Sequence, residues 1–126
     1  LEDVDLDLRA RLLGHKCVYL PQAVAYHMGS ATLGADNPRI ARLMIRNRLL
    51  LLFKSLPAGL WLRNFPRIFA EQLRSAFFYA AEGKAPLYCG ALAQAVAALC
   101  RMAAKRSRLQ SRKAVSASDF QSLLEP

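Results

Sequence analysis

The spacing of apolar and polar positions predicts a short amphipathic helix at the start of the chain. Val4, Leu8 and Leu12 recur at every fourth position, so they lie along one side of a helix. Gly14 follows the last of these positions, where a glycine commonly ends a helix by adopting a left-handed backbone conformation. We therefore expect a helix from the first residues of the chain to Leu13.

Two short extended segments are predicted next. Residues 16–20, KCVYL, and 23–28, AVAYHM, are rich in β-branched and aromatic side chains, and Pro21 and Gln22 separate them. Both are therefore predicted to be strands or extended segments, and two short strands are the stronger expectation. The stretch 29–38 is rich in Gly, Ser, Asp, Asn and Pro, which predicts a loop.

Helical periodicity returns after this loop and continues over most of the remaining chain. We predict three helical segments, from about Asn37 to Leu56, from about Pro66 to Glu82, and from about Pro86 onward. Asn37 and Pro38 are typical of the N-cap and the first position of a helix. Asn47 falls on the apolar side of the first segment, so it must find a hydrogen-bond partner.

The third segment does not predict a membrane span. It offers about fifteen apolar positions, mostly alanine, where about 20 of stronger hydrophobicity are needed. The helices as a group alternate apolar faces rich in Phe and Leu with arginines. Two interpretations stay open: the helices pack only on one another, or they also contact the surface of an anionic membrane.

Charge is distributed unevenly along the chain. Residues 1–38 hold five acids against three bases, whereas residues 39–126 hold fifteen Lys and Arg against four acids. A basic region of this size attracts nucleic acid, anionic lipid or a phosphorylated ligand. The aromatic side chains fall mostly on apolar faces, where they cannot stack on bases, so we predict no nucleic-acid partner.

The cysteines and residues 1–15 indicate the cellular compartment of the protein. Cys17, Cys89 and Cys100 show no paired spacing, so we expect reduced thiols. Residues 1–15 are acidic and polar, unlike a secretory signal. We predict a cytoplasmic protein, with attachment to the inner face of the cell membrane left open, and the absence of an initiator Met suggests a piece of a longer chain.

Carboxylates at the head of the first helix are the main candidates for chemistry. Asp3 and Asp5 can serve as helix caps, or one of them can act as a general base or metal ligand, because a helix N-terminus keeps a carboxylate ionised. Residues 3–5 also spell Asp-x-Asp, but that metal-binding motif normally ends a strand, and this one begins a helix. His27, beside Tyr26, is either a hydrogen-bonded structural residue or a ligand.

The order of these segments carries a family resemblance. The sequences EDVDLDLR, GHKCVYLP and VAYHMGS, followed by RNRLLLL, occur in that order within residues 1–57. In this region the chain resembles the C-terminal part of the family 2 glycosyltransferases, particularly the rhamnosyltransferase-like bacterial enzymes that build cell-surface polysaccharides. Beyond residue 57 only the general character, a basic helical extension, agrees.

The resemblance implies an α/β fold class, the GT-A fold of nucleotide-sugar transferases, of which this chain would hold a mostly helical C-terminal fragment with two short strands. Residues 1–36 would be the acceptor-side end of the catalytic domain. Residues 37–113 would form a basic helical extension, and residues 114–126 a flexible tail.

The resemblance also implies roles for particular acids. Asp3 would be the catalytic base that deprotonates the acceptor hydroxyl during inverting transfer, with Glu2 its neighbour and Asp5 the second choice. The partners would be a nucleotide-sugar donor and a glycan or lipid-linked acceptor.

Metal and phosphate contacts would come from other residues. His27 would help to hold a divalent metal, Mg²⁺ or Mn²⁺, in the complete enzyme. Arg46 and Arg48 would lie near the donor diphosphate or the acceptor phosphates, although a solvated or membrane-facing role is an equal alternative.

The family's nucleotide-binding loop and true Asp-x-Asp do not occur in these residues. We therefore expect the chain to be an inactive fragment of a glycosyltransferase without a complete metal site. The alternative is a non-catalytic, basic helical module that binds a membrane surface.

Overall fold

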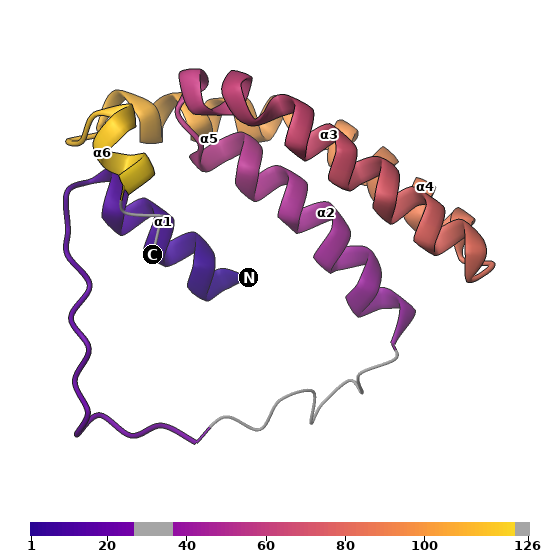
Figure 1. The fold of residues 1–126 in the computed structure, drawn as a ribbon, viewed down its shortest axis with the longest axis horizontal. Helices are drawn as coiled ribbons and strands as arrows, with labels where there is room; N and C mark the ends of the chain where they lie inside the picture. The colour runs from indigo at the N-terminus through magenta and orange to yellow at the C-terminus, as the bar shows by residue number, and fades with distance from the viewer. Residues whose placement is uncertain (27–36, 123–126) are drawn as a thin grey trace.

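The computed structural model describes residues 1–26 and 37–122, and all regular structure within them is helical (Figure 1). In chain order the helices are α1 (Glu2–Leu12), α2 (Pro38–Ser55), α3 (Ala58–Ala81), α4 (Ala85–Ala97), α5 (Leu99–Ser111) and α6 (Ala117–Ser122). No strand occurs in either described range. The predicted α/β class, with two short strands, is therefore wrong for this part of the chain.

The strand predictions fail because the extended segment has no neighbour to pair with. Residues 15–26 leave the helices without regular structure, as Figure 1 shows, and Tyr19 and Tyr26 are 84% and 96% exposed. A strand needs a second strand beside it to bond its backbone groups. The prediction was wrong over 16–20 and 23–26, while residues 27–36, with the rest of the second strand and most of the loop, lie outside the described residues.

The local signals at helix ends are confirmed. Gly14 and Gly83 follow the ends of α1 and α3 with φ of +83° and +68°, the left-handed conformation that glycine adopts most easily. At the start of α2 the Asn37 side chain accepts a hydrogen bond of 2.9 Å from the Arg39 N–H. The predicted bounds of the first two helices are therefore nearly correct.

Two helix boundaries differ from the prediction. α3 begins at Ala58, and Pro66 lies inside it, on the solvent-exposed side, where water can replace the missing N–H donor. The last predicted helix divides at Ala98 into α4 and α5, which meet at a bend of 55°. Within the described ranges no single helix has the length and apolar composition for a bilayer span, although α4 and α5 taken together pass that test.

Helix α2 is the centre of the arrangement. It packs against α4, α5 and α1, while α3 packs against α4 and α6 (Figure 1). One buried cluster contains Leu12, Leu56, Leu60 and Phe120, and a smaller one contains Leu50, Ala95 and Ala98. The first cluster joins α1, the α2–α3 turn, α3 and α6 into one apolar contact.

The segment expected as a flexible tail contributes to this cluster. Phe120, on α6, is fully buried, and the Ala114 N–H donates to the Leu12 carbonyl at 2.9 Å. Residues 117–122 are thus helical and packed against α1 and α3, unlike the loose tail that their composition suggested.

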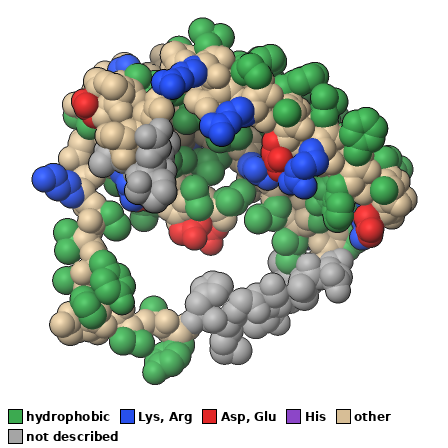
Figure 2. All heavy atoms as spheres, in the orientation of Figure 1, with side chains coloured by type: hydrophobic (Ala, Val, Ile, Leu, Met, Phe, Trp, Pro, Cys, Tyr) green, Lys and Arg blue, Asp and Glu red, His purple; other side chains and the backbone are tan. Residues whose placement is uncertain are grey.

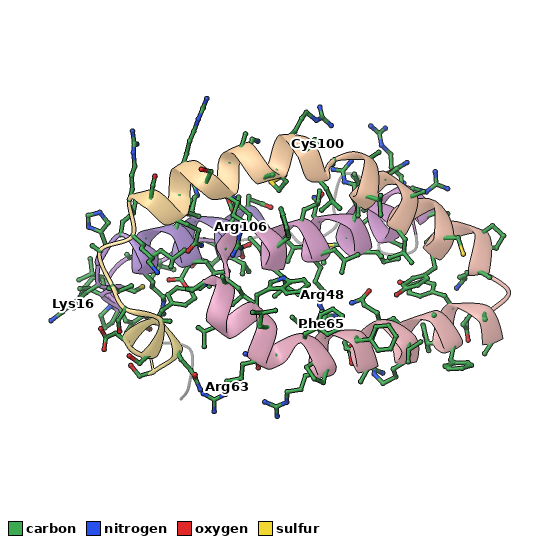
Figure 3. All side chains as sticks on the ribbon, turned by 90° about the horizontal axis from the view of Figure 1, so that it is seen from above. Lys16, Arg48, Arg63, Phe65, Cys100 and Arg106 are labelled. Atoms are coloured by element: carbon green, nitrogen blue, oxygen red, sulfur yellow. The ribbon has the colours of Figure 1, made fainter. Side chains whose placement is uncertain are left out.

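Side chains of α5 satisfy the carbonyl end of α2. Arg106 donates to the Phe53 and Leu56 carbonyls, the latter at 2.7 Å, and Figure 3 shows it between the two helices. Gln110 donates to the Ser55 carbonyl at 3.0 Å and to that of Lys54 at 3.4 Å. The last four carbonyls of a helix have no partner within it, so these two side chains supply what α2 lacks.

We predict that Arg106→Met lowers the free energy of unfolding by about 2 kcal/mol, because the methionine keeps the apolar stem but leaves partly buried carbonyls without donors. Urea denaturation of the whole chain measures the change. Arg108→Met, at an exposed position of the same helix, is the matched control and should change stability by less than about 0.5 kcal/mol. Equal effects of the two substitutions would contradict the capping role.

Candidate functional site

A pocket of about 630 Å³ lies where α1 meets α2, α4 and α5. Its apolar lining includes Leu50, Leu51 and Met102. Its polar lining consists of two acids, two amides and four cations: Glu2, Asp5, Asn47, Gln94, Arg46, Lys54, Arg101 and Lys105. Figure 2 shows acidic side chains at the lower edge of the helices, over the start of α1.

The acids reach this pocket because Glu2 and Asp5 are three residues apart on α1 and share a face. Asp5 is held on both sides. Lys54, on α2, contacts its Oδ1, and Arg9 Nε lies 3.2 Å from its Oδ2. The Asp5–Lys54 ion pair therefore fixes the head of α1 against α2.

The cations come from two helices. Arg46 and Lys54 are eight residues apart on α2, and Arg101 and Lys105 are four apart on α5, so each pair shares a helix face. The Arg46 Nη2 donates to Asn47 Oδ1 at 2.8 Å, which is the partner that Asn47 was expected to need. Arg101 and Lys105 form no ion pair with any residue of the described ranges, so their charge is available to an anion.

The structure places some of the predicted site residues in this pocket and others outside it. Glu2, Asp5 and Arg46 share the pocket, whereas the Asp3 side chain is 83% exposed and does not line it. Arg48 points from α2 toward α3, where its Nη1 lies 3.7 Å from Glu71 (Figure 3).

His27, predicted as a metal ligand, lies outside the described residues. Within residues 1–26 and 37–122, no three His, Cys, Asp or Glu side chains form a group that could hold a metal ion. Asp5, the most enclosed acid of the pocket, is already engaged by Lys54 and Arg9. The described residues thus do not fit a divalent metal site.

A backbone hydrogen bond stabilises the charge of Asp3 in the first turn of α1. The Val4 N–H donates to Asp3 Oδ1 at 2.8 Å and lowers the pKa of Asp3 from its ordinary value. The exposed Asp3 carboxylate is therefore charged at neutral pH, and the same hydrogen bond makes it a weaker base than a free aspartate.

Sequence reasoning did not single out Lys54, Arg101 or Lys105. A signal for each pair existed, because Arg46 and Lys54, like Arg101 and Lys105, repeat at helical spacing. That spacing cannot show that the two helices bring these faces together. The contact between α2 and α5 supplies this information.

Comparisons with protein families, with curated proteins and with solved structures return no match for this chain. The resemblance of residues 1–57 to the family 2 glycosyltransferases therefore stays an expectation, based on the motifs and their order.

The excess of cations over acids in the pocket predicts that it binds a small polyanion. Inorganic pyrophosphate should bind to the whole chain in isothermal titration calorimetry, more weakly as salt is added. Lys105→Gln should weaken binding about threefold to tenfold, as expected for one partly solvated charge pair.

Arg112→Gln removes the same charge from an exposed position just after α5, outside the pocket lining, and should leave the affinity unchanged. If both substitutions weaken binding equally, the anion responds to the net charge of the protein and the pocket is not a specific site.

Proposed function

We propose that this chain supplies the acceptor side of an inverting glycosyltransferase, which transfers a sugar from a nucleotide-sugar donor to a glycan or lipid-linked acceptor of the cell envelope. The observation that carries the proposal is the pocket in which Glu2 and Asp5 of α1 face Arg46, Arg101 and Lys105. Residues from the EDVDLDLR and RNRLLLL motifs, about forty positions apart, thereby line one cavity.

The two kinds of charge suit the two requirements of sugar transfer. A hydroxyl that attacks the anomeric carbon must lose a proton to a base within about 3 Å. The leaving nucleoside diphosphate, or a phosphate of the acceptor, must have its negative charge offset. Carboxylates at the head of α1 can accept the proton, and the cations of α2 and α5 can bind the phosphates.

Asp3, on the same turn of α1 as Glu2 but outside the pocket lining, is the candidate base. Asp5 is engaged by Lys54 and Arg9, so its oxygens serve to position α1. Asp3 is ionised, open to solvent and at the start of the helix, where the positive end of the dipole favours its charge. The resemblance assigns the base to the same residue.

The proposal predicts that Asp3→Asn, in the full-length product of the gene that encodes this chain, lowers kcat about 10²–10⁴-fold, because the amide cannot take the proton. The assay measures the transfer of sugar from a panel of nucleotide sugars to cell-envelope acceptors. Glu2→Gln is the matched control on the same turn, and its effect should be at most about tenfold.

Undiminished transfer by the Asp3→Asn enzyme would contradict this role. If Asp5→Asn alone abolished transfer with no loss of helix content, the second choice of base would replace the first. If the full-length protein carried out no transfer, the non-catalytic membrane-surface module would become the better account.

We also predict that the 126-residue chain alone shows no tight Mn²⁺ or Mg²⁺ binding, because its described acids do not gather into a ligand set. Calorimetric titration with Mn²⁺ measures this directly. Stoichiometric binding in the micromolar range or tighter would show that residues outside the described ranges, among them His27, complete a metal site.

A further inference from the structure

Helix α3 has its more polar side turned toward the protein. The partly buried positions of its middle and second half are mostly polar or amphipathic: Asn64, Ile68, Glu71, Gln72, Ser75, Ala76 and Tyr79. Helices of soluble proteins usually bury the apolar side and expose the polar one. This helix does the reverse over most of its length.

The apolar side of α3 faces solvent. We call it the outer face, and it consists of Leu62, Phe65, Phe69, Leu73 and Phe77, each between 45% and 74% exposed. These residues follow one another at intervals of three and four, so they form a single row. At about 1.5 Å per residue the row is ~22 Å long. A continuous exposed apolar row of this kind marks an interaction surface.

Aromatic contacts link the outer face to an apolar pocket. The rings of Phe65 and Phe69 stack at 6.1 Å, and Phe65 lies 5.3 Å from Trp61. Trp61 lines a cavity of about 400 Å³ between α2, α3, α4 and α5, and every residue that lines it is apolar: Leu49, Leu50, Leu52, Phe53, Trp61, Ile68, Leu92, Ala95, Val96 and Leu99. Trp61, the single tryptophan of the chain, therefore reports on both features.

Cations follow one border of the outer face. Arg63 and Arg67 are exposed, and the Arg63 Nη1 donates to Gln121 Oε1, on α6, at 3.1 Å. Arg74 lies on the same border, and Glu71, the only acid within α3, is 2.7 Å from it. An apolar row beside unneutralised arginines is the pattern of a helix that lies in the surface of an anionic bilayer.

We infer that α3 docks through its outer face on an anionic membrane, with the phenylalanines in the acyl boundary and Arg63 and Arg67 at the lipid phosphates. A leaflet supplies the apolar and the anionic complement together. A second copy of the chain supplies only the apolar part, because it carries the same net charge of +9 and repels the first. The inference stands apart from sugar transfer and holds whether or not the chain acts on sugars.

Vesicle binding by the whole chain tests the inference. Co-sedimentation with phosphatidylcholine vesicles that contain phosphatidylglycerol should show binding, and pure phosphatidylcholine vesicles should bind at least about tenfold more weakly. The emission of Trp61 should shift to the blue on binding, and lipids brominated along the acyl chain should quench it. Soluble phosphate should produce neither change.

Paired variants test whether the outer face itself, and not any exposed apolar side chain, binds the membrane. The double variant Phe69→Ser and Phe77→Ser should weaken vesicle binding at least about tenfold, because two large apolar side chains no longer leave water. Tyr19→Ser with Tyr26→Ser removes two still more exposed aromatic rings from the extended segment and should leave binding unchanged. Arg63→Gln with Arg67→Gln should weaken binding to the anionic vesicles alone.

Three outcomes would overturn the inference. The tyrosine variant could lose as much binding as the phenylalanine variant, or the wild-type chain could fail to bind anionic vesicles. Analytical ultracentrifugation could also show a dimer that Phe69→Ser and Phe77→Ser dissociate, which would assign the outer face to a second copy. Quenching of Trp61 in the wild-type chain needs no substitution, so it decides the matter even where a variant loses helix content.

Discussion

The structure depends on how α5 satisfies the carbonyl end of α2. Four carbonyls, from Phe53 to Leu56, accept hydrogen bonds from Arg106 and Gln110, one turn apart on α5. The Arg106 guanidinium also lies 5.5 Å from the centre of the Phe53 ring, and burial lowers the pKa of this arginine from its ordinary value while leaving it charged. Without these donors the α2–α3 turn would hold several unsatisfied carbonyls away from water.

The contact between α5 and the carboxyl end of α2 also determines the shape of the pocket. Lys54 is one of the capped residues, so the position of its ammonium group, and of the Asp5 carboxylate that it holds, follows from the way α5 meets α2. Arg101 and Lys105 lie on the same helix as Arg106 and so are brought to the opposite wall. Stability and candidate chemistry thus depend on one helix–helix contact.

Local features could be predicted from the sequence, and features that depend on distant partners could not. Asn37 and Gly14 act within one turn of their own helix, and the helix ends that they predict are correct. The strands failed because a strand forms only beside another, and the order of the segments said nothing about that neighbour. In the pocket, Glu2, Asp5 and Arg46 were predicted from motifs. Lys54 and the cations of α5 could be identified only from the contact between α2 and α5 in the structure.

The burial of Phe120 against Leu12 ties the two ends of the described chain together, although the two residues are 108 positions apart in sequence (Figure 1). Beyond this cluster, α1 is attached to the other helices chiefly through Asp5 and Lys54. A binding partner that drew α6 away would loosen α1 at its carboxyl end and so change the presentation of the acids at its other end. The position of the acids at the start of α1 thus depends in part on an apolar contact at the other end of the same helix.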